Sequence, residues 1–459
     1  MNWPDCCGRI GCLLANCSMD DGKPMNVLLI YPGLVDGFGS YRSGSDWFNH
    51  GVGIISAVLK QEGHRVRYLD CRQCRDWADV RTRIAAEPFA VALLSVATVD
   101  FDASRMIAGI IRELAPRAKI IAGGPHPTLA TAEMVGLPEF DCIFTHEAEV
   151  TLPALLADLD RLPRQVRGEM PMELDRLPFV DRALSPGGET PALWGLPRPF
   201  FTITASRGCP YLCTFCQPAE RMVFGNKVRK RSVTNILAEL EVLTGEHGMR
   251  SFMIHDDCFT QFPGWVEEFC REKQLRGLKQ PFVCQSRADI ICQRPELLAR
   301  LADAGLTWVL IGFESGSDRV LSFIKKGATV AQNLEAARIC RRLGIRIFAN
   351  YMFGLPTETE EEMRQTVAMI RTIRPDLYAP AVFTPAPGSE LYDYCRERDL
   401  ILIDSAAGYR RNVGSGAKIR GVDYALVRKM VGQSMRYAFL SRARQALQVL
   451  RNARCRLLA

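Results

Sequence analysis

Short apolar segments alternate with stretches of helical periodicity along this chain, and the alternation constrains the fold more than any other sequence feature. In a first series, strands are predicted at Asn26–Tyr31, Arg65–Asp70, Ala90–Ser95, Lys119–Gly123 and Asp141–Thr145. Helices are predicted between them at Gly51–Glu62, Asp76–Glu87, Ala103–Ala115 and Pro127–Val135. Strands joined by helical crossovers run parallel, so this series predicts a doubly wound α/β sheet. Such a sheet binds its ligand at the carboxyl ends of its strands.

A second series begins at Phe200. Its strands are predicted at Phe200–Ala205, Ser251–Asp256, Phe282–Arg287, Trp308–Phe313, Arg346–Phe353 and Leu377–Phe383. Its helices are predicted at Val233–Thr244, Gly264–Leu275, Pro295–Ala304, Ala331–Leu343 and Glu360–Ile373. Six such pairs predict a partial (β/α)6 barrel of the TIM type, with chemistry at the carboxyl ends of the strands.

The 459 residues are enough for two folded domains with a linker and a tail. We expect an N-terminal extension at 1–24, a Rossmann-like domain at 25–150, a helix and proline-rich linker at 151–199, a barrel at 200–390 and a basic helical region at 391–459. The longest apolar stretch, residues 89–99, is shorter than the roughly 20 residues that cross a bilayer. No transmembrane helix is therefore expected.

The 17 cysteines are odd in number and scattered, which fits a reducing compartment better than a disulfide framework. The segment Ile10–Cys17 weakly resembles a signal core that ends in a lipobox, but Asn16 occupies the position of the small residue. We therefore expect a cytoplasmic protein, with export as the alternative.

The positive charge is concentrated at the C-terminal end of the chain. The whole chain carries a net charge of +7, and residues 418–459 hold ten Lys or Arg against Asp423 alone. This distribution argues against a nucleic-acid binder. Apolar residues recur at helical spacing from Tyr424 to Leu450. The helix would either make a peripheral contact with the inner face of the membrane or pack on the barrel.

A cysteine-rich motif follows the first barrel strand. The sequence SRGCPYLCTFCQP places Cys209, Cys213 and Cys216 in one short loop. Three thiolates can hold three corners of an iron–sulfur cube and leave the fourth iron open to substrate. The alternative is a structural zinc site completed by Cys258 or His255.

This motif resembles the cysteine loop of the radical S-adenosylmethionine (SAM) superfamily. Four further segments support the resemblance at later strand ends: His255–Thr260, Gln285–Asp289, Gly312–Gly316 and Pro385–Ser389. The resemblance implies a [4Fe–4S] cluster on the three cysteines and SAM bound to the open iron. Asp256 and Asp257 would then accept hydrogen bonds from the SAM ammonium group, and Glu314 would accept them from the ribose hydroxyl groups. Arg287 would pair with the SAM carboxylate.

Simpler structural roles compete with two of these assignments. Arg287 and Asp289 could form a buried ion pair that shapes the barrel rim. Glu314 could have a purely structural role at its strand end. A basic run from Lys227 to Arg231 precedes Ser232, which is predicted to cap the next helix. That run is either a solvated turn or a contact for an anionic cofactor tail.

The first domain resembles the cobalamin-binding domain of cobalamin-dependent radical SAM enzymes. Gly123 and Gly124 match the family's glycine pair near the nucleotide tail, and Ser95 ends the third strand where a serine often lies. The loop after the first strand contains no D-x-H-x-x-G motif, so no histidine is expected below cobalt. The same absence fits a domain that has lost cobalamin. His126 is either a ligand or a loop histidine satisfied by the backbone.

Taken with the motifs, the resemblance implies a cytosolic cobalamin-dependent radical SAM enzyme, with methyl transfer to an unactivated carbon as the preferred reaction. Cyclisation, C–C coupling or rearrangement without methyl transfer is the alternative, followed by a non-enzymatic metal-binding or redox-sensing protein. The expected partners are a small-molecule or lipid substrate and an electron donor such as flavodoxin or ferredoxin. No nucleic acid is expected.

Overall fold

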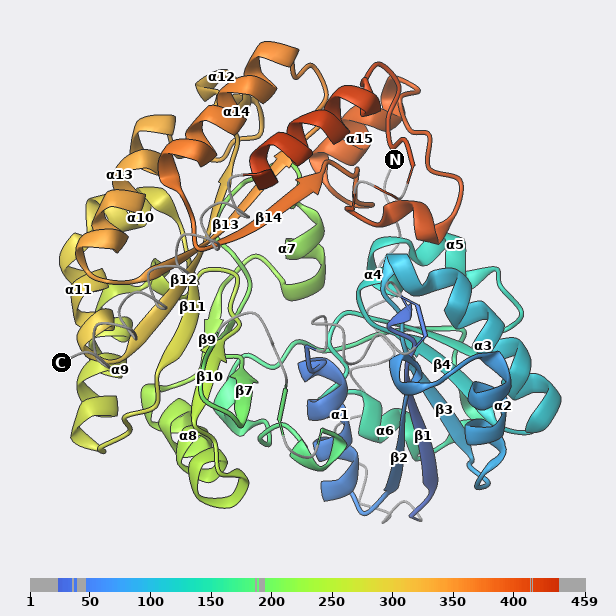
Figure 1. Ribbon diagram of the computed structural model, residues 1–459. Coiled ribbons are helices and arrows are strands. Elements are labelled where there is room, and N and C mark those ends of the chain that lie inside the picture. Colours follow the sequence, from blue (N-terminus) through green and yellow to red (C-terminus); the bar gives the residue numbers. More distant parts are fainter. Residues whose placement is uncertain are drawn as a thin grey trace, which may run out of the picture.

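The computed structural model describes residues 24–34, 37–38, 47–185, 188–189, 195–412, 414 and 416–436. The predicted signal-like segment Ile10–Cys17 and the second half of the C-terminal helix lie outside the described residues. Figure 1 shows two α/β units side by side, the first in blue and cyan and the second from green to orange.

The first unit is built on a parallel sheet with strand order β2-β1-β3-β4-β5-β6. Its strands are β1 (Asn26–Tyr31), β2 (Arg65–Asp70), β3 (Val91–Ser95), β4 (Lys119–Gly123), β5 (Cys142–Thr145) and β6 (Gln165–Arg167). Its helices are α1 (His50–Gln61), α2 (Trp77–Ala85), α3 (Phe101–Leu114), α4 (Pro125–Leu129), α5 (Thr131–Val135) and α6 (Leu152–Leu156). Alternate residues of β1 enter different cores: Leu28 and Ile30 pack on one face of the sheet, Val27 and Leu29 on the other. Both faces are therefore covered by helices, as a doubly wound sheet requires.

Two details of this unit differ from the prediction. Strand β6 comes from the segment expected to be a linker and pairs with β5 in parallel. It has only three residues, too few for a periodic pattern to reveal. The helix predicted at Pro127–Val135 is two short helices, because the backbone of Ala130 leaves the helical region between them.

The second unit is a curled parallel sheet, a half-barrel with strand order β14-β13-β12-β11-β10-β7. Its strands are β7 (Phe200–Ile203), β10 (Ser251–Ile254), β11 (Phe282–Ser286), β12 (Leu306–Glu314), β13 (Arg346–Phe353) and β14 (Leu377–Val382). Its helices are α7 (Ala219–Phe224), α8 (Val233–His247), α9 (Pro263–Leu275), α10 (Ala288–Gln293), α11 (Pro295–Asp303), α12 (Asp318–Phe323), α13 (Val330–Arg342), α14 (Glu360–Ile373) and α15 (Glu390–Glu397). The predicted fold class is confirmed in both units.

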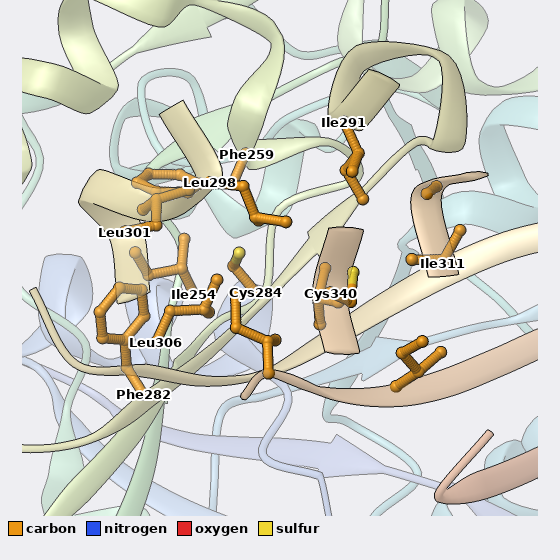
Figure 2. Packing of buried hydrophobic residues seen from close by; sticks show 14 of the residues in the cluster. Ile254, Phe259, Phe282, Cys284, Ile291, Leu298, Leu301, Leu306, Ile311 and Cys340 are labelled. Atoms are coloured by element: carbon orange, nitrogen blue, oxygen red, sulfur yellow. The ribbon is translucent and has the colours of Figure 1, made fainter. Parts of the chain in front are cut away.

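Apolar side chains between the half-barrel strands and the outer helices form its core. Figure 2 shows Ile254 of β10, Phe282 of β11 and Ile311 of β12 facing residues of the surrounding helices. The inner face is filled at its base by another cluster that includes Phe200, Trp308 and Leu377. The chemistry is thereby left to the carboxyl ends of the strands.

A helix at residues 424–436 packs into the outer core of the half-barrel. Val427, Met430 and Val431 are buried there, and the hydroxyl groups of Tyr351 in β13 and Ser434 are 2.9 Å apart. The described half of the predicted apolar stripe is thus barrel packing. Among the described residues, no helix is both long and apolar enough to span a membrane.

Candidate functional site

A cleft lies where the carboxyl ends of the two sheets face each other. Its empty space, including the open mouth, is about 1410 Å³. Ser95, Gly123 and Gly124 line it from the first sheet, and Ser206 and Asp257 line it from the half-barrel. Asp257, predicted for SAM, therefore shares one cavity with the three residues predicted for cobalamin. The lining of this cleft does not include the other residues predicted for SAM or the cluster, which are Asp256, Arg287, Glu314, Cys209, Cys213 and Cys216. Ser95 and Gly123 are direct neighbours in the β3–β4 pairing.

The two positions at the end of β4 are occupied by glycine for different physical reasons. Gly124 has φ +106°, and a Cβ there would lie 2.9 Å from the backbone nitrogen and oxygen of Val96. Only glycine fits that backbone. At Gly123 a Cβ would meet Phe144 at an ordinary 3.8 Å, so its absence leaves free space at the cleft wall. We call the surface formed by Ser95, Gly123 and Gly124 the cradle. This cradle, with the apolar cleft wall beside it, fits a bulky cofactor.

His126 does not face the cleft. It is buried, it stacks on Phe101 at 4.5 Å between ring centroids, and its Nδ1 is 3.2 Å from the Thr98 hydroxyl. Burial lowers its pKa to about 4. His126 is therefore a buried residue of the short helix α4 and not a loop histidine, and its hydrogen-bond partner is a hydroxyl and not the expected backbone carbonyl.

Three other histidines, His50, His146 and His255, line the cleft. His50 Nε2 lies 2.7 Å from the Thr202 hydroxyl, which ties α1 to β7. The sequence analysis did not identify His146 or His255 as cleft residues. Their signal in the sequence is that each directly follows an apolar strand, β5 for His146 and β10 for His255.

The cysteine loop begins after the two-residue strand β8 (Ser206–Arg207), which pairs with β9 (Arg229–Lys230). Cys213 is buried, Cys209 is half-buried and Cys216 is exposed. Backbone bonds shape the loop: the amide groups of Cys216 and Gln217 both donate to the Cys213 carbonyl, at 3.0 and 2.8 Å. Burial, together with nearby carboxylates, raises the pKa of Cys209 to about 12. Iron must therefore displace a proton when it binds this thiol.

Among the described residues, no three His, Cys, Asp or Glu side chains are placed to hold one metal ion. Cys258, the candidate fourth ligand, is buried beside the Thr260 hydroxyl. A zinc ion would need all its ligands within about 2.3 Å of itself, whereas an iron–sulfur cube holds each thiolate on a different iron. The three cysteines, which do not converge on one ion, are compatible with the cube.

Arg287 contacts the cysteine loop and its neighbours, and its guanidinium group does not face an empty site. Its guanidinium makes two bonds to Asp289, at 3.0 and 3.1 Å, and stacks over the Tyr211 ring at 3.7 Å. It also lies 3.8 Å from the Cys213 sulfur and donates to the Lys326 carbonyl. The buried ion pair considered for Arg287 and Asp289 is thus present, and it uses Nε and Nη2, while Nη1 contacts the Cys213 sulfur.

Two adjacent aspartates after β10 have different surroundings. Asp256 is 1% exposed and accepts from the Ala205 amide at 2.7 Å and the Ser206 hydroxyl at 2.6 Å. Both of its oxygens are used inside the protein, which argues against the predicted contact with SAM. Asp257 is exposed and lines the cleft, and its carboxyl group shares a hydrogen bond with Glu220. Burial raises the pKa of Asp257, and burial together with Asp257 raises that of Glu220 to about 8.

Glu314 also has an internal partner. Its Oε1 lies 2.8 Å from the Lys326 ammonium, and both side chains are about nine-tenths buried. A Cβ at Gly312 would lie 2.2 Å from the same Oε1, so that glycine leaves room for the ion pair. Burial opposes the charge on Lys326, but Glu314 outweighs it and raises the lysine pKa. The structure therefore favours the structural role of Glu314 over the predicted ribose contact.

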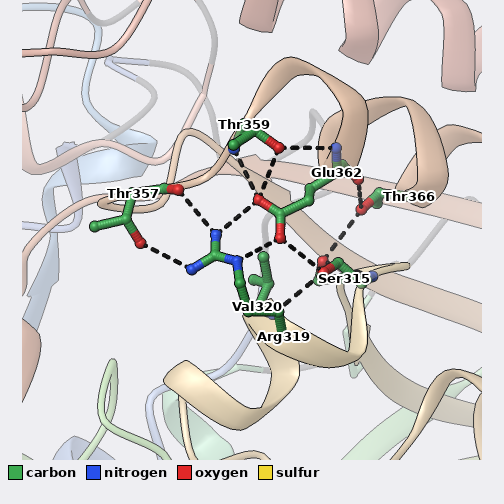
Figure 3. A network of polar contacts seen from close by, with 8 residues as sticks. Ser315, Arg319, Val320, Thr357, Thr359, Glu362 and Thr366 are labelled. Carbon is green, nitrogen blue, oxygen red and sulfur yellow. Dashed lines mark hydrogen bonds and ion pairs between the residues drawn. The ribbon is translucent and has the colours of Figure 1, made fainter.

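The turn after Glu314 is held by the polar network in Figure 3. The Gly316 amide donates to Thr366 at 2.8 Å, and Arg319 contacts both oxygens of Glu362, at 2.6 and 2.7 Å. Hydrogen bonds from Arg319 lower the pKa of Glu362 to about 2. This network fixes the end of β12 against the N-terminus of α14.

The basic run after the cysteine loop is solvated in part, because Lys227 and Lys230 are exposed whereas its arginines have internal partners. Arg229 is buried, and the Lys230 ammonium lies 4.3 Å from the centre of the Phe262 ring. Arg231 donates to the Thr204 carbonyl at 3.0 Å. Ser232 caps α8 as predicted, because its hydroxyl accepts from the Asn235 amide at 3.1 Å.

Two protein-family models match the chain, and together they cover more than half of it. The radical SAM superfamily matches residues 203–370 and the B12 binding domain matches residues 41–156. The chain therefore belongs to the radical SAM enzymes that carry a B12-binding domain, and its cofactors are a [4Fe–4S] cluster, SAM and cobalamin.

The chain is similar to several known proteins. It is 26% identical to an uncharacterized methyltransferase, PH0819, of Pyrococcus horikoshii, over 77% of this chain and 79% of that protein. It is 27% identical to the anaerobic magnesium-protoporphyrin IX monomethyl ester cyclase of Cereibacter sphaeroides, over 82% of this chain and 64% of that one. The fold is similar to that of the cobalamin-dependent SAM radical enzyme OxsB, with a TM-score of 0.67, 18% identity and coverage of 89% of this chain and 66% of OxsB.

These findings confirm the predicted family, enzyme class and cofactors. The predicted methyltransferase function agrees with the methyltransferases among the relatives.

Proposed function

We propose that this enzyme methylates an unactivated carbon of a small molecule through a 5′-deoxyadenosyl radical. The observation that supports it best is the shared cleft, because Ser95 and Gly123 line one wall and Asp257 lines the other. A methyl carrier and a radical source must both reach one substrate carbon, so they need one water-poor cavity. When bound, cobalamin supplies methyl transfer, and the cluster with SAM supplies the radical.

The chain's own residues hold and orient these groups in the proposed enzyme. Cys209, Cys213 and Cys216 hold the cluster, and Asp257 accepts hydrogen bonds from the SAM ammonium. Ser95, Gly123 and Gly124 form the cobalamin cradle. Three residues become positioning residues in this proposal: Asp256, Arg287 and Glu314. We also propose that the cobalamin-binding unit extends to residue 167, because β6 pairs with β5.

Cyclisation without methyl transfer is the second candidate, because a cyclase is among the relatives that align with most of this chain. The two reactions differ in their SAM products. A methyltransferase consumes a second SAM to restore the methyl group on cobalamin, so it forms S-adenosylhomocysteine together with 5′-deoxyadenosine. A radical cyclase forms 5′-deoxyadenosine alone.

The test is anaerobic reconstitution with iron, sulfide, cobalamin, SAM and a strong reductant, followed by measurement of both SAM products. The proposed methyltransferase forms both. Replacing Cys209, Cys213 and Cys216 with Ala should remove the iron and the 5′-deoxyadenosine. Cys292→Ala, which changes a half-buried cysteine of α10, is the matched control and should retain both. Absence of both products from the wild-type enzyme would favour the sensor hypothesis.

Two partners complete the proposal. The cluster needs one electron for each SAM cleaved, and a flavodoxin or ferredoxin in the cytoplasm would supply it. A peripheral membrane contact, with a lipid substrate, would have to use residues after Arg436, because the described half of the helix is packed on the barrel. Flotation with anionic liposomes tests this: a chain that ends at Arg436 should lose any binding that the full chain shows.

A further inference from the structure

Four charged side chains join the first sheet to the base of the cysteine loop. Glu147 and Glu149 lie just after β5, Arg207 ends β8 two residues before Cys209, and Arg229 begins β9. All four are nearly buried, with side chains between 4% and 11% exposed. We call these four residues the interdomain charge clamp.

The contacts of the clamp run across the boundary between the two units. Arg207 bridges both glutamates, with Nη1 2.8 Å from Glu147 Oε2 and Nη2 2.8 Å from Glu149 Oε1. Arg229 holds Glu147 from the other side, with Nη1 2.8 Å from the same Oε2 and Nη2 in contact with Oε1. Arg229 also donates to the carbonyl groups of Pro171 and Phe224, at 2.8 and 3.0 Å.

The hairpin beneath the cysteine loop depends on this carboxylate from the other unit. The antiparallel β8–β9 pairing places Arg207 directly opposite Arg229. Like charges opposite each other in a ladder repel, and buried charges without partners are strongly unfavourable. Glu147 lies between the two guanidinium groups, and together with Glu149 it balances their two positive charges.

The backbone around Glu147 is also closely fixed. His146 has φ 66°, a conformation that non-glycine residues adopt only where the surrounding structure enforces it. A Cβ at Gly168, after β6, would lie 1.8 Å from the Glu147 carbonyl oxygen. Only glycine at position 168 therefore allows the chain after β6 to pack against the turn at His146 and Glu147. The first sheet thus sets the position of the Glu147 carboxylate.

We propose that the interdomain charge clamp consists of positioning residues that set the spacing between the cysteine loop and the cobalamin-binding strand ends. This inference rests on the proposed function, which places the cluster on that loop and cobalamin in the cleft. Glu147, Glu149 and Arg207 line the cleft wall between the two places. Because methyl and radical chemistry must meet at one carbon, a small shift between the cofactors would uncouple them.

Glu149→Gln in the full chain is the decisive variant, because it removes one charge and leaves Arg207 its bond to Glu147. The matched control is Glu113→Gln, which breaks an exposed ion pair with Arg81 in the same unit. The readout is the distance distribution between Co(II) and the reduced cluster, measured by dipolar electron paramagnetic resonance. This signal comes only from folded, doubly loaded molecules, so a loss of stability alone does not change it.

We expect the distribution of Glu149→Gln to broaden about twofold, with iron and cobalamin contents unchanged, and that of Glu113→Gln to match the wild type. An unchanged distribution in Glu149→Gln would overturn the proposal. If this variant does not load both cofactors, Arg207→Lys is measured in the same way, since lysine keeps the charge but cannot bridge two carboxylates. Failure of both variants to load, with a normal control, would make the clamp a folding device and overturn the positioning role.

A different result would contradict the proposed function, so the two failures are distinguishable. A wild-type protein that binds neither cluster nor cobalamin would contradict it before any clamp variant is measured.

Discussion

At the scale of single residues, neighbouring carboxylates at the barrel mouth differ in their partners and in their exposure: Asp257 shares a hydrogen bond with Glu220 at the cleft, whereas the other two are bonded in the interior. Asp256 and Glu314 are bonded inside the protein, to the end of β7 and to Lys326. Asp257 is the exposed member of the set and lines the cleft. Position at a strand end is thus common to all three, and the internal partners decide which one is available to a ligand.

Asp257→Ala and Asp256→Ala should separate these roles. Asp257→Ala should reduce formation of 5′-deoxyadenosine about tenfold or more, the effect of losing a charged hydrogen bond of about 1.5–3 kcal/mol. Asp256→Ala should lower the free energy of unfolding by about 2 kcal/mol or more, because it leaves two buried donors unpaired. Denaturant titration and product assays of both variants provide the check. The division of roles is wrong if Asp257→Ala is the destabilised variant and cleaves SAM normally.

His126 should make the protein less stable in mild acid. Its pKa is lowered from 6.5 to about 4 by burial, so between these values the unfolded chain binds a proton that the folded protein does not. The free energy of unfolding therefore falls as the pH drops below about 6.5, and no further loss comes from this group below about pH 4. Between pH 7 and pH 5 the contribution is about 2 kcal/mol.

Urea unfolding of the wild type and of His126→Gln at both pH values measures this contribution. The difference between pH 7 and pH 5 should be smaller in the variant by about 2 kcal/mol. Equal differences in the two proteins would show that His126 does not titrate as its burial requires.

At the scale of elements, the pattern of apolar residues predicted the positions of strands well and the buried faces of helices less well. The predicted stripe of the C-terminal helix included Val427, Val431 and Met435. In the structure the buried face includes Met430 and Ser434, while Met435 is 46% exposed. The helix is rotated relative to the prediction, because the surface of the barrel selects the face that is buried.

Two methionines of this helix offer a matched test of the packing. Met430 is fully buried, so Met430→Ala should lower the free energy of unfolding by about 2–5 kcal/mol. Met435→Ala should change it by less than about 0.5 kcal/mol. Thermal or urea unfolding followed by circular dichroism distinguishes them. Equal and small effects would mean that the helix does not belong to the barrel core.

At the scale of the whole molecule, the two sheets place their functional ends on one cleft, and this raises the question of cobalt ligation. We expect cobalamin to bind without a histidine below cobalt, because the loop after β1 has no D-x-H-x-x-G motif. Paramagnetic resonance of the Co(II) form should then show no extra splitting from an axial nitrogen. His126 is excluded from the cleft lining, which includes His50, His146 and His255. A nitrogen splitting that disappears in His50→Ala or His146→Ala would contradict the expectation.

The sequence by itself determined the two α/β units, the cysteine loop and the glycine pair. Each of these depends on local chemistry: periodic burial, thiolate spacing, or a backbone that tolerates only glycine. The β8–β9 hairpin and β6 were missed because two or three residues cannot display a period.

Only the tertiary structure decided which charged residues face the cleft and which hold the protein together. Arg287, Asp256 and Glu314 are bonded to residues from other segments, among them Tyr211, Ser206 and Lys326. A buried charge is stabilised by whichever partner the packing brings within a few ångströms, and that partner is often far away in the sequence. Glu147 and Arg229, 82 residues apart, meet only because the two sheets lie against each other.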